Sequence, residues 1–513
     1  MQEGAHHEDA KYFILISDLR VVKRTGPLGC VPRTRVLYSA PYSASPSSTP
    51  ASTWLSGSAG AMDPRRTETM YSVYSVLTIV AFVVGAPYFL YQAVRRRSLT
   101  SLGQRLGFLP RSLEADGRVV VWIQAVSVGE VRAARSLVAG LRQAHPRLRI
   151  VLSTTTVTGQ EVARSDHPDL DVFYFPLDLP WIVARALDLV RPSLFVMVET
   201  ELWPNVLRAC RRRGIRTALV NARISPRSFP RYVMIRPVFG RVLSDIDRFC
   251  AQDEQSVSRL VEMGADRSRV STTGSLKFDS AALGDVSPGS TGRDVLRHFR
   301  VAADRPVIVA ASTRRGEEDI VLDAFARARS VAPGCMLLLV PRHPERAQEV
   351  VELVARAGFS VRKRSELRLD GEPTEDVVVV DTVGELARLY GLATVVFVGG
   401  SLVDWGGHNI LEPAVWGKAI VFGPHMQNFA EIAQTFLAHG AACQVDSADG
   451  FSEVLVRLLG DPSRRAELGR AAAELVQRNR GAVQKTLTVL DEILPRSAAP
   501  TATAPVTTPS QVH

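Results

Sequence analysis

The chain has 513 residues, of which 46% are hydrophobic and 22% charged, which is the composition of a globular protein too long for a single core. Its formal net charge of +10 favours an anionic partner, such as a nucleic acid, a membrane surface or a phosphorylated substrate. The five cysteines have no C-x-x-C spacing, which argues against a disulfide scaffold or a zinc knuckle and fits a reducing compartment.

Residues 1–69 form a leader that we predict to be disordered. The stretch "SAPYSASPSSTPASTWLSGSAGA" is rich in Ser, Ala and Pro and shows no apolar periodicity. Met62 and Met70 stand just before the organised part, so translation is expected to start at Met1 or at one of these two.

Residues 70–97 are predicted to form a membrane anchor with a basic flank. No charge interrupts the run from Tyr71 to Ala93, and an arginine triplet at 95–97 follows it. About 20 apolar residues cross a bilayer, and arginines after the span place the rest of the chain on the cytoplasmic side. A buried helix and a helix lying in the membrane interface remain alternatives, because Ser, Thr, Gly85 and Pro87 interrupt the run.

From residue 118 onward, apolar strands alternate with amphipathic helices, which predicts an α/β protein with two doubly wound parallel sheets facing each other across a cleft. A Gly/Ser/Asp-rich linker at 279–294 divides the strands into two series, so we predict domains at 98–284 and 285–494 and a disordered tail at 495–513. The predicted strands are 119–126, 150–156, 172–176, 194–200, 217–222 and 249–252, then 307–312, 336–341, 377–381, 394–399 and 419–423.

Ligands of such sheets bind beyond the carboxyl ends of the strands, and polar residues follow several predicted strands directly. The stretch "QAVSVGEVRAARSL" reads as strand, glycine turn and helix, and it puts Glu130 where a phosphate often binds free N–H groups. In "ETELWPN", Glu199 and Glu201 follow another strand. Lys277, in "TGSLKFD", lies at the junction of the two domains.

In the second half, "GGHNILEPAVWGK" has two glycines, an N-cap residue in Asn409 and the start of a short helix. Its N–H groups are candidates to hold a phosphate, and Glu412 a candidate to accept hydrogen bonds from a ribose; an ordinary capped helix is the alternative. Arg342, in "PRHPER", is a further candidate for the phosphate. The histidines are too dispersed for a metal site and the predicted cleft loops have no D-x-D motif, so we expect metal-independent chemistry.

Eight stretches taken together resemble the 3-deoxy-D-manno-octulosonic acid (Kdo) transferase family of lipopolysaccharide inner-core assembly. They occur in the family's order, and the similarity covers roughly residues 71–494. Gln124 stands where histidine is common in the family, and Trp405 replaces a variable residue. The stretches are "AVSVGEV", "STTTVTG", "ETELWPN", "NARISPRS", "TGSLKFD", "LVPRHPER", "VGGSLVDWGGHNILEPA" and "FGPHMQNF".

The resemblance implies a GT-B type enzyme with two Rossmann-like domains at the cytoplasmic face of the bacterial inner membrane. The N-terminal domain would bind a lipid A precursor (lipid IVA) and the C-terminal domain CMP-Kdo. Kdo transfer would invert the anomeric carbon and release CMP, without metal or cofactor. Glu130 would be the general base, kept ionised by the helix N-terminus, and Glu199 and Lys277 transition-state stabilisers. The implied CMP contacts are Pro341, Arg342, Val383, Gly384, Glu385, Asn409, Ile410, Leu411 and Glu412.

Two alternatives remain. Another two-domain nucleotide-sugar glycosyltransferase or epimerase would share the fold but lack the paired "SVGE" and "ETELWPN". A membrane-tethered nucleic-acid binder would cluster its basic and aromatic side chains, whereas these arginines are spread along the chain, so no nucleic acid is expected as a partner.

Overall fold

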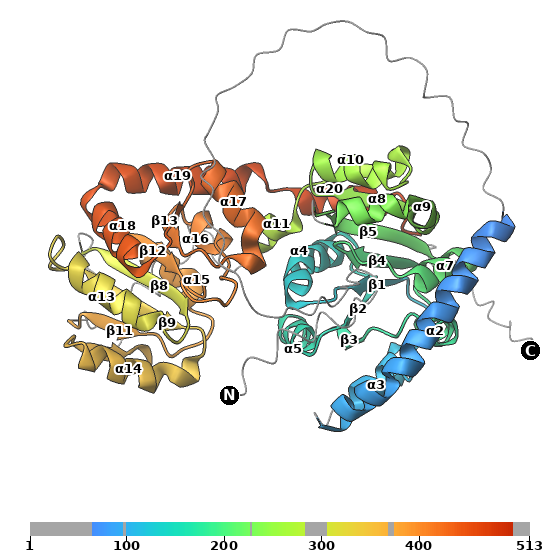
Figure 1. Cartoon of the computed structure of the whole chain (residues 1–513), viewed down its shortest axis with the longest axis horizontal. Coiled ribbons are helices and arrows are strands. Elements are labelled where there is room, and N and C mark those ends of the chain that lie inside the picture. The colour runs from blue at the N-terminus through green and yellow to red at the C-terminus, as the bar shows by residue number, and fades with distance from the viewer. Residues whose placement is uncertain (1–63, 96–98, 226–227, 283–304, 368–373, 496–513) are drawn as a thin grey trace, which may run out of the picture.

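The computed structural model describes residues 64–95, 99–225, 228–282, 305–367 and 374–495. Residues 1–63 of the predicted leader, most of the linker and nearly all of the predicted tail lie outside these ranges. Within them the chain forms two α/β lobes, each built on one sheet, with a long helix, α2 (Pro64–Arg95), beside the N-terminal lobe (Figure 1).

The first sheet has seven parallel strands in the order β3-β2-β1-β4-β5-β6-β7. The six strands predicted from the sequence are all present, because buried parallel strands appear in sequence as continuous apolar runs. The strands are β1 (Val120–Gln124), β2 (Arg149–Thr154), β3 (Asp171–Tyr174), β4 (Leu194–Val198), β5 (Arg216–Ala222), β6 (Arg248–Ala251) and β7 (Val270–Thr272).

The second sheet is also parallel, in the order β10-β11-β9-β8-β12-β13-β14. Its five predicted strands are confirmed, and two short strands, β10 and β14, lie at its edges. The strands are β8 (Val307–Thr313), β9 (Met336–Pro341), β10 (Val361–Lys363), β11 (Val377–Val379), β12 (Val395–Val398), β13 (Ala419–Phe422) and β14 (Cys443–Gln444).

Helices cover both faces of each sheet, as the alternating pattern predicts, so each sheet separates two hydrophobic cores. The first sheet packs against α4 (Val128–Ala144), α5 (Val157–Asp166) and α20 (Ala482–Asp491) on one face, and α6 (Pro180–Val190), α7 (Pro204–Arg213), α9 (Arg236–Ser244) and α10 (Glu254–Glu262) on the other. The second packs against α13 (Glu318–Ala328), α14 (Ala347–Arg356) and α18 (Ala448–Gly460), and against α15 (Leu386–Leu389), α16 (Leu411–Val415), α17 (Ala430–Ala438) and α19 (Pro462–Arg478).

The predicted limit of the C-terminal domain at residue 494 is wrong, because α20 belongs to the N-terminal core. Leu487 and Leu490 of this helix are buried in the same cluster as residues of β1 and α4. The carboxylate of Asp279 fixes the start of α20 by accepting hydrogen bonds from the N–H groups of Gly481 and Val483, at 2.8 and 2.7 Å. The chain therefore crosses between the domains twice.

Helix α2 is docked along the N-terminal domain through polar contacts on one face. The Tyr71 hydroxyl donates to Asp245 at 2.8 Å, and the Tyr74 hydroxyl to Asp178 at 2.9 Å. The helix begins at Pro64, and Glu68 pairs with two arginines of α7, so the predicted leader ends earlier than residue 69. Its segment Thr67–Pro87 is long and apolar enough to cross a membrane, by length and composition alone.

The outer face of α2 is an apolar stripe of six exposed side chains. They are Val73, Val76, Leu77, Val80, Val83 and Val84.

Candidate active site

The candidate catalytic residues lie at the point where the strand order of the first sheet reverses. Strands β1 and β4 are neighbours there, but the chain leaves them toward opposite sides of the sheet. Glu130 follows β1 and Glu199 follows β4, so both side chains reach the crevice that this reversal opens. The placement expected from the sequence is therefore confirmed for both carboxylates.

Glu130 lies in the first turn of α4 and folds back over the turn that precedes it. Its carboxylate accepts a hydrogen bond from the N–H of Val126 and another, at 3.2 Å, from the hydroxyl of Ser127. The residue is only 8% exposed. The anion in this turn is thus supplied by the protein, and the backbone N–H of Val126 binds a carboxylate in place of a phosphate.

The helix N-terminus, which we expected to keep Glu130 ionised, does not decide the pKa of this group. Burial raises the pKa of Glu130 well above its ordinary value, and the charges of Glu201 and Glu199 raise it further. The hydrogen bonds from Val126 and Ser127 lower the pKa, but they are outweighed. A carboxyl group with a raised pKa binds a proton more strongly, which suits a base that must take one from an alcohol.

Glu199 forms an ion pair with Lys277, with 2.7 Å between the carboxylate oxygen and Nζ. Glu199 has φ = 62°, in the left-handed region that residues other than glycine rarely adopt, and Asn221 at the end of β5 has φ = 54°. The Asn221 amide donates to Glu199 at 3.4 Å, while its oxygen accepts from the N–H of Leu276 at 3.0 Å. Such local strain is typical of functional sites, and here it orients both members of the ion pair.

Lys277 lies in α11 (Leu276–Ala282), between the two domains. Its neighbour Leu276 is buried in the core of the N-terminal domain, and its other neighbour, Phe278, in that of the C-terminal domain. The sequence-based position of Lys277 at the domain junction is confirmed.

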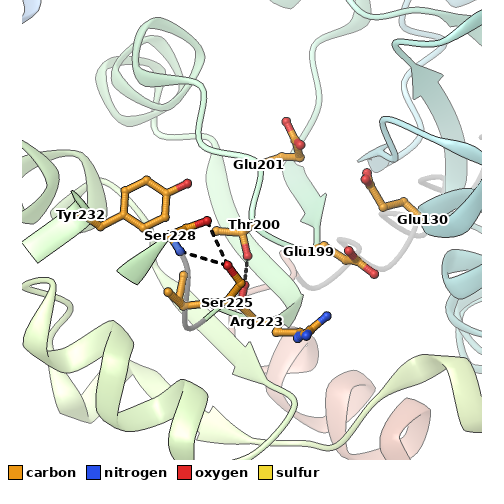
Figure 2. Close-up of a pocket in the computed structure, with 9 residues that line it drawn as sticks. Glu130, Glu199, Thr200, Glu201, Arg223, Ser225, Ser228 and Tyr232 are labelled. Carbon is orange, nitrogen blue, oxygen red and sulfur yellow. Dashed lines mark hydrogen bonds between the residues drawn. The ribbon is translucent and has the colours of Figure 1, made fainter. Parts of the chain in front are cut away.

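Glu130 and Glu199 line one cavity of about 230 Å³ in the N-terminal domain. Figure 2 shows Glu130 entering from α4, and Glu199, Thr200 and Glu201 from the loop that follows β4. Glu201 was expected to follow a strand but was given no role, and Arg223, which follows β5, also lines the cavity. The remaining lining residues are Ile224, Ser225, Ser228 and Tyr232.

The predicted donor residues follow three strands of the second sheet, β9, β11 and β12. These strands are close together in the sheet, because β11 and β9 are neighbours and only β8 separates β9 from β12. Pro341 ends β9, and the backbone of Arg342 bonds to Thr313 at the end of β8. Burial lowers the pKa of the Arg342 guanidinium, and the positive charge of Arg132 lowers it further. Arg132 is on α4, half a turn beyond Glu130, so a cation of the N-terminal domain faces the donor residues.

His408 indicates how cationic this region is. Burial lowers its pKa to about 3, assisted by the charges of Arg314, Arg342 and Arg132. The sequence did not indicate that Arg314 and Arg132 lie in this region, because only the fold brings them to the ends of β9 and β12. Several cations beside one another are expected where a protein binds an anion.

Asn409 and Glu412 are held together at the start of α16. The Asn409 oxygen accepts from the N–H of Leu411 at 3.1 Å, and its amide donates to Glu412 at 3.0 Å. Burial raises the pKa of Glu412. The predicted N-cap is therefore wrong by one residue, because Ile410 occupies the N-cap position and Asn409 precedes it. The Asn409 side chain still binds one N–H group at the helix start that we expected to be free for a phosphate.

The loop 382–385 holds the other predicted donor residues. Gly384 has φ = 89°, and Val383 is 86% exposed. The Glu385 carboxylate accepts from Arg364 at 2.9 Å and from the hydroxyl of Thr382. This carboxylate is therefore already engaged, which favours a contact through the backbone of the loop.

The chain is similar to proteins of known activity over most of its length. Residues 100–280 match the family model described as 3-Deoxy-D-manno-octulosonic-acid transferase (kdotransferase). The 3-deoxy-D-manno-octulosonic acid transferase of Haemophilus influenzae is 37% identical over 384 residues, which are 74% of this chain and 88% of that protein. The enzyme of the same name from Bordetella pertussis is 34% identical over 389 residues, 73% of this chain and 87% of that protein.

A solved structure of the C-terminal CMP-Kdo binding domain of WaaA from Acinetobacter baumannii shares 34% sequence identity. The match covers 34% of this chain and 91% of that domain, with a TM-score of 0.32. Matches of 384 and 389 residues extend over both domains of this chain. The chain is therefore a glycosyltransferase and belongs to the 3-deoxy-D-manno-octulosonic acid transferase family.

Proposed function

We propose that the protein transfers Kdo from CMP-Kdo to a hydroxyl group of a lipid A precursor, lipid IVA, with inversion of the anomeric carbon and release of CMP. The observation that supports this best is that Glu130, Glu199 and the Lys277 paired with Glu199 meet at the switch point of the acceptor domain. The similarity to a domain named for CMP-Kdo binding supports the assignment of the donor to the second domain.

In this reaction the acceptor oxygen attacks the anomeric carbon of Kdo while the bond from that carbon to the phosphate oxygen breaks. The electron pair of the broken bond leaves with CMP, and the proton of the acceptor hydroxyl moves to Glu130. The ionised form of Glu130 takes this proton, and its raised pKa makes that form a stronger base.

Glu199 and Lys277 would act on charge that develops in the transition state. The Kdo ring gains positive character at its anomeric carbon, which a carboxylate stabilises, while the departing phosphate and the sugar carboxylate are stabilised by an ammonium group. The 2.7 Å ion pair holds both groups in place before substrate arrives, so little reorganisation is needed.

On the donor side, we propose that Arg342 binds the phosphate and that Glu412 accepts a hydrogen bond from the ribose. Pro341, the loop at 383–385 and the backbone of 409–411 would complete the CMP site. Following the family resemblance, we propose that the reaction needs no metal, and full activity in the presence of EDTA would test this.

We further propose that α2 anchors the enzyme to the cytoplasmic face of the inner membrane. Its outer stripe is apolar, and its inner face is bonded to the domain that would hold the lipid acceptor. A lipid-linked acceptor would thus stay at the membrane surface while its sugar enters the cavity.

The test is incubation of the purified full-length enzyme with CMP-Kdo and a tetra-acylated lipid A precursor, followed by mass measurement of the lipid. Addition of one or more Kdo residues by the wild type, and none by Glu130→Gln, would support the proposal. Transfer only from a different sugar nucleotide would favour the alternative of another two-domain glycosyltransferase.

A further inference from the structure

The loop after β4 carries a second carboxylate into the catalytic cavity. Glu201 lines the cavity together with Glu130 and Glu199 (Figure 2). Its position is fixed by the two residues that follow it, since Leu202 and Trp203 pack against the core of the N-terminal domain. Glu201 itself is not needed for that packing.

Glu201 differs from the other two carboxylates in having no polar partner. Glu130 is held by Val126 and Ser127, and Glu199 by Lys277. Across the ranges of the chain that the structure describes, the Glu201 side chain makes no hydrogen bond or ion pair. A partly buried carboxylate in this state costs stability, and such groups are normally compensated by a partner or by a ligand.

The other polar groups of the cavity are already engaged with the protein. The hydroxyl of Thr200 donates to the backbone oxygen of Arg223, and those of Ser225 and Ser228 bond to each other at 2.9 Å. Arg223 forms an ion pair at 2.9 Å with Glu431 of the C-terminal domain. Glu201 therefore offers the cavity a hydrogen-bond acceptor that the protein does not use.

The chemistry of the missing partner follows from the charges around it. Burial and the charge of Glu199 raise the pKa of Glu201 to about 7, so the surroundings disfavour further negative charge. A phosphate or carboxylate would be repelled, whereas a neutral hydroxyl group can donate a hydrogen bond to the carboxylate oxygens. Sugars carry such hydroxyls on adjacent carbons, at a spacing that two neighbouring carboxyl groups can share.

We propose that Glu201 is an acceptor-binding residue that accepts a hydrogen bond from a sugar hydroxyl next to the attacking one, and so holds the attacking oxygen against Glu130. This inference rests on the proposed function, because it requires the acceptor sugar to occupy this cavity. The nucleotide of the donor is not the partner, since its predicted contacts follow strands of the other sheet. If a hydroxyl of the Kdo ring were the partner, removal of Glu201 would raise the donor KM instead of the acceptor KM.

The test compares Glu201→Ala, which removes both oxygens, with the isosteric Glu201→Gln, which keeps one acceptor and preserves the shape of the loop. We expect the acceptor KM to rise about ten-fold or more in Glu201→Ala and less in Glu201→Gln. The donor KM and the affinity for CMP should stay within two-fold of wild type. Glu262→Ala is the matched control, because Glu262 is an exposed carboxylate at the end of α10.

A set of mono-deoxy acceptors sharpens the test. One of these analogues lacks the hydroxyl that Glu201 binds. Its affinity for the wild type should be about as low as the affinity of the natural acceptor for Glu201→Ala. It should lose little more with the variant, because the interaction is already absent. An unchanged acceptor KM in Glu201→Ala, or equal rises in both substrates' KM values, would overturn the inference.

Binding of the deacylated acceptor disaccharide, measured by calorimetry without donor, separates this inference from the proposed function. Weaker binding to both Glu201 variants would support the role of Glu201 even if no Kdo were transferred. Equal binding to wild type and variants would refute it even if Kdo transfer were demonstrated.

Discussion

Replacing Glu201 by Gln should stabilise the protein at alkaline pH, because the wild-type carboxylate is ionised there without compensation. The folded-state pKa of Glu201 is about 7, against an ordinary value of 4.5. Because the folded value is the higher one, the stability contributed by the protonated form is complete below pH 4.5 and is lost as the pH rises through 7. At about 1.4 kcal/mol per pKa unit, the full loss is about 3 kcal/mol by pH 8.

Coupling to Glu199 and the partial exposure of Glu201 reduce this figure, and we expect about 1–2 kcal/mol. In a domain of this size that corresponds to a rise in Tm of roughly 2–8 °C for Glu201→Gln at pH 8, and a much smaller rise at pH 5. Calorimetric melts of wild type, Glu201→Gln and the control Glu262→Gln at both pH values would measure it. A Tm difference that is absent, or is the same at pH 5 and pH 8, would show that burial and the charge of Glu199 do not destabilise the ionised form of Glu201.

Glu130→Gln should keep its affinity for CMP and lose transfer by at least ~100-fold, and near-normal turnover of the variant would refute the assignment. The transfer rate of the wild type should fall on acidification at a pH well above 4.5, since the base must be ionised. Asn409→Ala should lower the free energy of unfolding by about 1 kcal/mol, through the lost bond to the N–H of Leu411, and should weaken CMP binding. Glu412→Ala should mainly raise the donor KM. If calorimetry found wild-type CMP affinity in Glu412→Ala, this stretch would be an ordinary helix start without a role in donor binding. Replacing Leu77 and Val80 on the outer stripe of α2 by Ser should release the enzyme from membrane fractions without lowering its Tm, and unchanged fractionation would argue against the anchor.

Much of the fold could be predicted because its buried strands are apolar runs with helices between them. The strands that were missed, β7, β10 and β14, are short and lie at sheet edges, where one face is solvated. β7 has one buried, one half-buried and one exposed residue, β10 has one exposed and two half-buried residues, and β14 has only two residues. An edge strand of two or three residues carries no period that distinguishes it from a loop. The return of α20 to the first domain was missed for a different reason, because an amphipathic helix does not specify which sheet it covers.

The candidate site, like the fold, could be predicted only in part. The motifs identified Glu130, Glu199 and Lys277 as a group, and the structure brings the first two to one cavity and pairs the second with the third. The raised pKa of Glu130 was not expected, because the helix N-terminus is visible in sequence but the burial of the carboxylate and the approach of Glu201 are not. Likewise, the N-cap of α16 is Ile410 and not Asn409 as expected, although the Asn409 oxygen does accept from the N–H of Leu411. The bond from the Asn409 amide to Glu412 depends on side-chain geometry that the sequence does not show.

The distribution of charge across the two domains matches the direction of the proposed reaction. Three carboxyl groups line the proposed acceptor cavity, while the charges of three arginines act on His408 beside the proposed donor site. As the acceptor attacks, its proton moves to the side rich in carboxylates, and the negative charge of the leaving phosphate grows on the side rich in cations. Each movement reduces a repulsion that already exists in the free protein, between Glu130 and Glu201 on one side and among the arginines on the other. In the proposed reaction, the electrostatic cost of assembling like charges would therefore be recovered in the transition state, where it would lower the barrier.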